Sequence, residues 1–472
     1  MRGNVHAVTM VSAMENEAKY KQTLDYLFSF VDFSLQHTHQ YSPASFDLGR
    51  MISFIHSLGN PERDYPIIHI AGTKGKGSVC SFCAYALKAS GNRVGLYTSP
   101  HLWDYTERIQ IDGQPITHAD LGELVDEVKP FVNAIPQITM FEITTGLAFL
   151  YFSRQKVDAA VIEVGLGGRL DATNICHPNV TVITSLSYDH TYLLGNTLTE
   201  IAGEKAGIIK PGIPVVLSPQ KDEARQVVER IATEQNAPLI QVGQEYRYSP
   251  VTHSLENQTF IIWSAANQDN IDAYLRGKKT GKWKPTTLTI PLLGEHQVEN
   301  AATAYVALQV ARQTGIPIQE DAIDRGFSEV KWPGRFEILQ KEPPVIVDSA
   351  HNRDSAFKLR TAVDDYFPGR PVVLIFGASE DKDILGMFTE LLPRVRQVVL
   401  TKSFHPRAAD PALLAEMVTR FNLPAVVVPS VSEAFTEASL LAQDEAVVLV
   451  CGSLFITAEI RQAWQNRISH GK

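Results

Sequence analysis

Short apolar segments alternate along this chain with segments in which apolar residues recur three and four positions apart. The first kind predicts buried strands and the second predicts amphipathic helices. In the first half we expect strands at 67–71, 94–98, 159–164, 180–185 and 215–217. Helical spacing at 20–33 and 51–58 predicts two helices before the first strand, and residues 1–20 are expected to be frayed. Strands that alternate with helices predict a parallel α/β sheet.

The pattern changes at residue 245 and again near residue 332. Short β-type runs separated by polar loops at 245–293 predict a small antiparallel appendage. Trp332-Pro333-Gly334 is typical of a hinge, and alternation restarts after it with strands expected at 345–347, 372–376, 398–400, 425–428 and 447–450. We therefore predict two α/β domains, 1–331 and 332–472, of which the second, at roughly 140 residues, is within the usual size of a domain.

Composition narrows the class of protein. The 472 residues carry a net charge of -9, which does not suggest a nucleic-acid or anionic-membrane partner, and the basic stretch 276–284 is interpreted as a solvated loop. Four cysteines fit a reducing compartment. Cys80 and Cys83 form a C-x-x-C pair inside an expected helix, so core packing is favoured over a redox or zinc site. With no signal peptide or membrane-length apolar run recognised, we expect a cytoplasmic enzyme.

A glycine-rich turn follows the first expected strand, in the stretch from His69 to Ser78. Strand, glycine turn and helix form a phosphate-binding arrangement, because backbone N–H groups and the helix N-terminus point at the anion. Lys76 can reach terminal phosphates. The standard P-loop has Ser or Thr directly after this lysine, whereas Gly77 intervenes here before Ser78. The alternative interpretation is a turn without a ligand.

Three further groups, Ser99, Glu163 and His190, each follow an expected strand of the first half. If those strands neighbour the glycine-turn strand, these side chains can complete a Mg²⁺ shell that includes phosphate oxygens. Each alone has an ordinary structural interpretation, as a turn serine, a solvated strand end or a loop cap.

In the second half, Asp348 to Asn352 follows a strand, and Arg335 follows the hinge glycine and could bind phosphate. Lys205 lies in an expected helix, where the default interpretation is an exposed lysine. Pattern and composition alone indicate a Mg²⁺- and nucleotide-dependent two-domain enzyme and do not separate kinase, ATPase and ligase.

A resemblance separates them. The loop Gly72 to Ser78 resembles the ATP loop of the Mur ligase superfamily, and several further runs resemble folylpolyglutamate synthase/dihydrofolate synthase within it. These runs are Tyr97 to Leu102, Tyr105 to Ile109, Phe141-Glu142, Glu163 to Asn174, Asp189 to Thr191, Glu204 to Ile208, Gly294 to Gln297, Pro333 to Glu337 and Ala350 to Asn352. The resemblance runs from about residue 45 to the C-terminus, and Glu163 to Asn174 is its most specific part.

The family implies a P-loop ATPase-type N-terminal domain with the small β appendage, and a Rossmann-like C-terminal glutamate ligase domain. It implies ATP binding by Gly72, Thr73, Lys74, Gly75, Lys76, Gly77, Ser78, Asn300, Arg335 and Asp348. Ser99, Glu163 and His190 match Mg²⁺ ligands, and Phe141, Glu142, Leu170, Asp171, Ala172 and Ser453 match substrate-binding positions. Lys76, Lys205 and His351 match catalytic positions, with Lys205 carbamylated and His351 and Ser453 at the glutamate pocket.

The implied activity is ATP-dependent ligation of L-glutamate to dihydropteroate, to the γ-carboxylate of tetrahydrofolates, or to both, through an acyl phosphate. The implied cofactors are ATP, two Mg²⁺ ions, the carbamate on Lys205 and possible K⁺, and we expect a monomer with no nucleic-acid or membrane partner. Three positions depart from the family pattern: Lys74 replaces Asn, Ser349 replaces Gly and Arg353 replaces Pro. Two alternatives stay open, another Mur-type ligase acting on a cell-wall precursor and a non-catalytic nucleotide-binding regulator.

Overall fold

The computed structural model describes residues 16–31, 47–278 and 280–470. Contacts within the chain group the described residues into two compact units. The first comprises residues within 1–186, 190–240 and 304–326, and the second comprises 187–189, 241–303 and residues from 327 onward. The predicted domains, 1–331 and 332–472, stay a prediction.

The first unit is built on an eight-stranded sheet with the order β4-β3-β2-β5-β1-β6-β7-β8. The strands β2, β5, β1, β6 and β7 are parallel, and β3 and β4 are antiparallel additions at one edge. Their bounds are β1 Ile67–Ala71, β2 Val94–Tyr97, β3 Ile109–Ile111, β4 Gln114–Pro115, β5 Ala159–Glu163, β6 Val180–Ile183, β7 Val215–Leu217 and β8 Leu239–Gln241. The predicted parallel sheet is therefore confirmed, with β1 at its centre.

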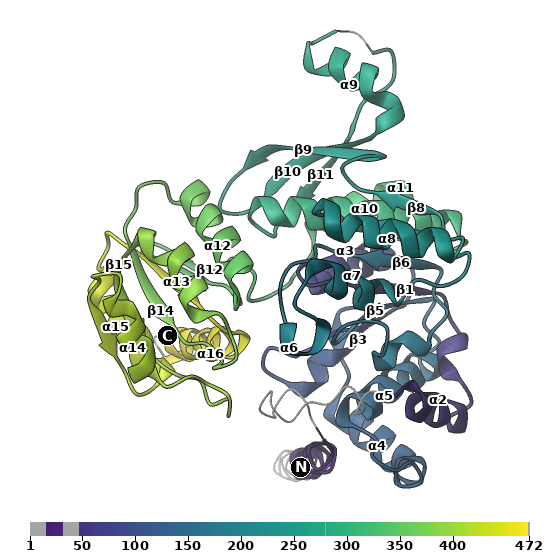
Figure 1. Ribbon diagram of the computed structural model, residues 1–472, viewed down its shortest axis with the longest axis horizontal. Helices are drawn as coiled ribbons and strands as arrows, with labels where there is room; N and C mark the ends of the chain where they lie inside the picture. The colour runs from purple at the N-terminus through teal and green to yellow at the C-terminus, as the bar shows by residue number, and fades with distance from the viewer. Residues whose placement is uncertain (1–15, 32–46, 279, 471–472) are drawn as a thin grey trace, which may run out of the picture. The chain divides into compact units, whose positions relative to one another are not determined.

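Helices cover the sheet, so its central strands β1, β5 and β6 are buried along their whole length and are mostly apolar. One core combines α2, α4 and α5 with Ile67, Tyr97 and Ile162 of the sheet, and Figure 1 shows these three helices together. Another combines Ala71 and Ile183 with α7 and α8. The helices are α2 Leu48–Ser57, α3 Lys76–Ala89, α4 His118–Asn133, α5 Met140–Arg154, α6 Thr191–Leu194, α7 Leu198–Ala206 and α8 Asp222–Glu234. Two further helices, α10 Glu295–Gln313 and α11 Glu320–Ser328, belong to this unit over residues 304–313 and 320–326.

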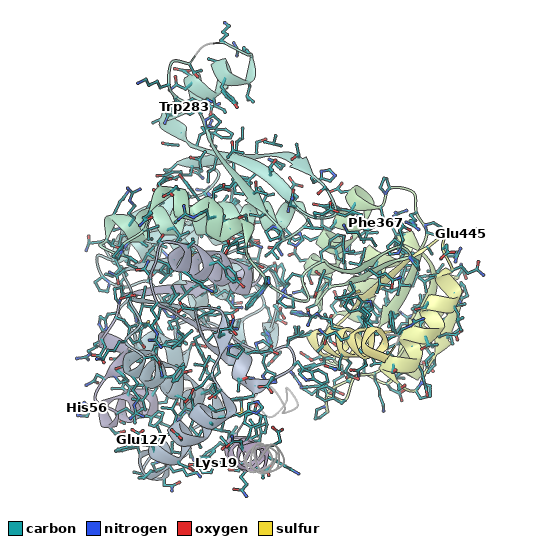
Figure 2. All side chains as sticks on the ribbon, turned by 180° about the vertical axis from the view of Figure 1, so that it is seen from behind. Lys19, His56, Glu127, Trp283, Phe367 and Glu445 are labelled. Carbon is teal, nitrogen blue, oxygen red and sulfur yellow. The ribbon has the colours of Figure 1, made fainter. Side chains whose placement is uncertain are left out.

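A helix at 16–28 precedes these elements. Residues 16–20 were expected to be frayed, and this expectation is wrong, because Tyr20 is buried and its hydroxyl donates to Asp104 at 2.9 Å. Lys19, labelled in Figure 2, forms an ion pair with Asp126 of α4. The expected helix at 20–33 continues to residue 28, and its last two residues, like residues 1–15, lie outside the described part of the chain.

The predicted β appendage is confirmed as a three-stranded antiparallel sheet, β11-β10-β9, in the second unit. Its elements are β9 Tyr246–His253, β10 Gln258–Ser264, α9 Gln268–Leu275 and β11 Thr286–Ile290. The pairing of β9 with β10 shifts register at Thr259/Phe260, where Pro250 lies opposite Phe260. Arg276, Lys278, Lys282 and Lys284 are exposed near Trp283, as predicted for a solvated loop (Figure 2).

The second unit also holds a six-stranded sheet with the order β12-β13-β17-β14-β15-β16. All neighbours are parallel except β12, an antiparallel edge strand that the sequence pattern did not predict. The bounds are β12 Glu337–Lys341, β13 Pro344–Val347, β14 Val372–Phe376, β15 Val395–Leu400, β16 Ala425–Val427, β17 Val447–Cys451, α12 Arg353–Tyr366, α13 Ile384–Leu391, α14 Pro411–Thr419, α15 Val431–Ala442 and α16 Leu454–His470.

Among the helices of the described residues, none combines the length and the apolar character that a membrane span requires. The four cysteines are free and buried. Cys80 and Cys83 lie in α3, where burial raises the pKa of both thiols, so the prediction that this pair packs in the core is confirmed.

Candidate active site

The glycine loop connects β1 to α3 and is fixed against the neighbouring strand β6. Gly72 has φ +150°, and a Cβ there would lie 1.8 Å from Thr184 Oγ1, so this position requires glycine. The N–H groups of Thr73 and Lys74 both donate to the carbonyl of Ser185, each at 3.0 Å. The first part of the loop is thus held by its own sheet.

The second part of the loop begins α3. Gly75 is the N-cap, with φ +87°, and it provides no side-chain hydrogen bond to the first turn. The first helical residues are Lys76, Gly77 and Ser78, so their backbone N–H groups stand at a positive helix end that suits an anion. The helix α3 thus includes Gly77 and Ser78. Gly77 is therefore part of the helix rather than an extra loop residue.

Glu163, the last residue of β5, is buried beside this helix end. Its Oε1 lies 3.9 Å from Lys76 Nζ, and its Oε2 accepts a hydrogen bond of 3.0 Å from the backbone N–H of Ser99. Adjacent parallel strands bring these groups together, since β5 pairs with both β1 and β2. A buried carboxylate next to a serine and a lysine suits a Mg²⁺–phosphate complex, because Mg²⁺ prefers oxygen ligands.

His190 stands at the N-cap of α6, with φ +49°, and its Nδ1 lies 3.2 Å from the hydroxyl of Tyr192. In the described part of the chain, no group of three or more His, Cys, Asp or Glu is placed to hold a metal ion. The structure thus joins Ser99 and Glu163 with Lys76, while a role of His190 as a third ligand stays a prediction.

Lys205, in α7, is buried, contrary to the default interpretation of an exposed helical lysine. Its Nζ donates to the carbonyl of Gly72 at 2.9 Å, so the side chain reaches the start of the glycine loop. A Cβ on Gly168 would lie 3.0 Å from the Cα of Lys205, which means that the glycine-rich turn after β5 packs directly on this part of α7.

Phe141 and Glu142 lie in the first turn of α5 near the same glycine-rich turn. A Cβ on Gly165 would lie 2.4 Å from Phe141 Cζ, so the aromatic ring rests on the turn. Glu142 accepts from the backbone N–H of Thr139 in a capping box and pairs with Arg50 at 3.2 Å. Its carboxylate therefore fixes the start of α5.

Asp171 is buried, and its carboxylate holds the glycine-rich turn that follows β5. Its Oδ2 accepts from Leu166 N at 2.9 Å, and its Oδ1 accepts from Thr173 N at 3.0 Å and from Thr173 Oγ1 at 2.6 Å. Burial raises the pKa of Asp171, and these hydrogen bonds oppose that shift. Leu170 and Ala172 flank it, partly exposed and buried respectively.

In the second unit, Asp348 holds the segment that carries Arg335. Asp348 Oδ2 accepts from Phe336 N at 2.7 Å and Oδ1 accepts from Ala350 N at 2.8 Å. Phe336 has φ +40°, a strained value for a residue with a side chain, and it is buried. Ser349 donates through both its N–H and its hydroxyl to the carbonyl of Gly334, each at 3.0 Å.

The ends of β13 and β17 run side by side beyond the sheet. Gly452 N donates to Ala350 O at 2.9 Å, and Thr457 Oγ1 donates to the carbonyls of Asp348 and Ser453. Ser453 is buried and accepts from Ile456 N, and His351 Nδ1 lies 2.8 Å from Ser349 O. Asp348, His351 and Ser453 are therefore gathered at one edge of the second sheet.

Asn300 lies buried on α10, where its amide donates to Gln297 Oε1 at 3.0 Å. One turn earlier, His296 is half-buried, and loss of hydration lowers its pKa to about 3, with the charges of Lys358 and Arg335 acting in the same direction. Asn300 and Arg335 are thus both in the second unit, and the charge of Arg335 acts on the imidazole of His296.

Sequence reasoning missed the residues that fix these segments. Thr184 and Ser185 hold the glycine loop, and Glu337 accepts from Gly334 N at 2.7 Å while it pairs with Arg461 at 2.8 Å. Pro333 to Glu337 was recognisable as a motif, but Arg461 lies far along the chain in α16 and carries no local signal. Of the other departures, Arg353 pairs with Glu390 at 3.0 Å.

Comparison with known proteins agrees with this geometry. Residues 70–308 match the Mur ligase middle domain, and residues 334–454 match the Mur ligase glutamate ligase domain. The chain is 35% identical over 423 residues to the dihydrofolate synthase/folylpolyglutamate synthase of Bacillus subtilis, covering 88% of this chain and 94% of that protein. It is 34% identical to a probable bifunctional folylpolyglutamate synthase/dihydropteroate synthase of Haloferax volcanii, covering 95% of this chain but only 51% of that protein.

Solved structures lead to the same family. Mycobacterium tuberculosis folylpolyglutamate synthase, solved with ADP and AMPPCP, superposes with a TM-score of 0.81 at 30% identity, covering 95% of this chain and 99% of that one. E. coli FolC, solved with DHPP and ADP, gives 0.80 at 31% identity, covering 95% and 98%. The resemblance seen in the motifs is confirmed: this chain belongs to the folylpolyglutamate synthase/dihydrofolate synthase family of the Mur ligase superfamily.

Proposed function

We propose that this protein is an ATP-dependent ligase that joins L-glutamate to dihydropteroate, to the γ-carboxylate of tetrahydrofolates, or to both. The observation that carries the proposal is the position of the buried Glu163 carboxylate. It lies 3.9 Å from Lys76, which is at the start of α3, and it accepts a hydrogen bond from the backbone N–H of Ser99. A helix end, a lysine and an acidic ligand together form a site for a metal-bound nucleotide. The identity of the acceptor substrate is inferred from the family to which the chain belongs.

The chemistry requires activation, because a carboxylate is a poor electrophile. Transfer of the γ-phosphoryl group of ATP to the acceptor carboxylate gives an acyl phosphate and ADP. The amino group of L-glutamate then attacks the acyl carbon, and phosphate leaves. Lys76 and the N–H groups at the start of α3 would stabilise the charge of the transferring phosphoryl group. Mg²⁺, held by Glu163, Ser99 and His190, would neutralise phosphate charge when bound.

Lys205 is proposed to be carbamylated. Its amine already lies next to the carbonyl of Gly72, at the start of the glycine loop, and is buried. Carbamylation would convert this cation into a carboxylate-like group that can support a second Mg²⁺ ion. Mass spectrometry of bicarbonate-treated protein, together with loss and partial chemical rescue of activity in Lys205→Ala, tests this assignment; wild-type activity of that variant would contradict it.

The second unit is proposed to contribute to both ATP and glutamate binding. Asn300, Arg335 and Asp348 would serve ATP, and His351 and Ser453 would serve the glutamate pocket. In support, Asp348, His351 and Ser453 share one edge of the second sheet, where open α/β sheets bind ligands. The bonds of Asp348 to Phe336 and Ala350 suggest that it acts by holding Arg335.

The decisive experiment measures ADP release and product mass with dihydropteroate and with tetrahydrofolate, each with and without L-glutamate. We expect turnover that depends on glutamate with at least one acceptor. Turnover only with a muramyl peptide would support the cell-wall alternative, and ATP binding without turnover on any acceptor would support the regulator. Repeating the assay with KCl replaced by NaCl tests the proposed K⁺ requirement, and sedimentation tests the proposed monomer.

A further inference from the structure

His69 is a buried titratable residue that the proposed mechanism leaves without a role. It lies in the middle of β1, its side chain is completely buried, and its strand neighbours Ile67, Ile68 and Ile70 are apolar. An imidazole is costly to bury unless its polar atoms are used. His69 Nε2 lies 2.9 Å from Thr173 Oγ1, which joins the central strand to the segment that follows the glycine-rich turn after β5.

The hydrogen bonds around Thr173 define which nitrogen of His69 carries the proton. Thr173 Oγ1 donates its single proton to Asp171 Oδ1 at 2.6 Å, so it can only accept from His69. The proton of His69 therefore resides on Nε2. Nδ1 has no hydrogen-bonding partner among the described residues, so a proton there would be an orphaned buried donor. Burial, with a smaller effect of Lys210, lowers the pKa of His69 to about 3, which keeps the ring neutral.

The same set of contacts continues to the glycine loop. Asp171 fixes the turn through Leu166 N, and Gly168 of this turn packs on the backbone of Lys205. Arg169 N also donates to the carbonyl of Glu204 at 2.8 Å. Lys205 Nζ in turn donates to Gly72 O, one residue beyond β1. The contacts thus form a closed ring. It runs from His69 of β1 through Thr173, Asp171 and the turn to Lys205, and from Lys205 back to Gly72, just beyond the end of β1.

We propose that His69 is a positioning residue, a fixed Nε2–H donor that acts through Thr173 and Asp171 to hold the Gly165–Arg169 turn against Lys205 and the acceptor-binding side. This inference rests on the proposed function and extends it to a residue that contacts neither ATP nor acceptor. The ring explains why a polar residue occupies the middle of an otherwise apolar strand.

Two matched pairs of variants test the proposal. Gln in place of His69 can present an amide N–H near the position of Nε2, whereas Leu cannot; likewise Ser keeps the hydroxyl of Thr173 and Val removes it. For His69→Leu and Thr173→Val we expect KM for the folate acceptor to rise about tenfold and kcat to fall about tenfold, with KM for ATP within about twofold. His69→Gln and Thr173→Ser should recover most of the loss.

A double-mutant cycle distinguishes positioning from simple loss of packing. If His69 acts through Thr173, the double variant His69→Leu/Thr173→Val should be no worse than the poorer single variant in kcat/KM. A loss of kcat/KM in the double variant equal to the product of the two single losses would overturn the proposal. So would a His69→Leu variant that only unfolds at lower temperature while kcat and both KM values stay unchanged. If His69→Leu does not fold, the Thr173 pair provides the same comparison.

A spectroscopic measurement is independent of the ligase activity. With ¹⁵N-labelled histidine, the ring nitrogens of His69 should show the neutral Nε2–H tautomer, unchanged between pH 5 and pH 8. The reversed arrangement, with a proton on Nδ1 and a neutral Asp171, would overturn the inference even if ligation is observed. Observation of the Nε2–H tautomer in a protein that ligates no folate would instead contradict the proposed function and leave the hydrogen-bonded chain intact.

Discussion

The carboxyl edges of the two parallel sheets use their buried carboxylates differently. At the first sheet, Glu163 accepts a backbone hydrogen bond of 3.0 Å from Ser99, and its other oxygen lies 3.9 Å from the amine of Lys76. At the second sheet, each oxygen of Asp348 accepts a backbone N–H within 2.8 Å. A carboxylate that lies beside a lysine at a helix N-terminus suits a metal-bound phosphate, whereas one whose two oxygens both accept from backbone N–H groups suits a structural role. The position after a parallel strand therefore does not by itself define a ligand-binding residue.

The strongest test of this difference is at Lys76. Lys76→Ala should reduce ATP-dependent ligation on the order of a thousandfold, because a charge that stabilises the transferring phosphoryl group is lost. Thermal unfolding should change little, since Lys76 is partly exposed and its ion pair is long. Coupled ADP-release kinetics measure the effect. The neighbouring Lys74→Ala is the matched control and should lose much less; equal losses would mean that general positive charge, rather than position, matters.

Exchanging each carboxylate for its amide separates the two edges. Glu163→Gln should reduce kcat/KM about a hundredfold with a stability change below about 1 kcal/mol, because the amide oxygen can still accept from Ser99. Asp348→Asn should destabilise the protein by about 1–3 kcal/mol, because an amide NH₂ would face a buried backbone N–H. Urea unfolding and steady-state kinetics of both variants provide the comparison. Similar stability losses would remove the distinction between the two sites.

Acid should destabilise both units through histidines that the fold keeps neutral. Burial lowers the pKa of His69, His101 and His296 to about 3, below the ordinary value of 6.5. Between pH 3 and pH 6.5 the unfolded chain binds more protons than the folded chain. The free energy of unfolding is therefore fully present above pH 6.5 and decreases as the pH falls toward 3. Each histidine contributes a slope of up to about 1.4 kcal/mol per pH unit.

Urea unfolding at several pH values measures that slope. His296→Gln should reduce this slope by the contribution of one histidine, up to about 1.4 kcal/mol per pH unit. The exposed His56, labelled in Figure 2, provides the comparison variant His56→Gln, which makes the same exchange outside the core. An unaltered slope in His296→Gln would show that this imidazole is not kept neutral by burial.

The smallest expected effect concerns Ser349, a departure from the family pattern. Its hydroxyl donates to the carbonyl of Gly334 at 3.0 Å and is buried, so Ser349→Ala should cost about 1 kcal/mol. Differential scanning calorimetry and KM for ATP measure the consequences for stability and for the Arg335 segment. An unchanged melting temperature would show that the backbone N–H of Ser349 alone holds Gly334.

Sequence patterns predicted the strands and the positions of the polar residues that directly follow them, because both depend on the local order of residues. The strand 67–71 and the strand 372–376 match the observed β1 and β14, and the meeting of Ser99, Glu163 and Lys76 follows from strands that end at one edge. Patterns could not predict contacts set by non-local pairing. Thr184 requires glycine at position 72 only because β6 lies beside β1, and the bond of Asp348 to Phe336 depends on the register of β12 with β13.

The register shift in the appendage has a consequence for behaviour at high concentration. β9 is an edge strand of its sheet, and an unpaired edge is a template for strands from other molecules. Pro250 lies in β9 opposite Phe260, where pairing becomes irregular, and proline has no N–H to donate. Pro250 therefore interrupts the row of donors at an edge that could otherwise recruit further copies, and so protects the protein against edge-to-edge aggregation.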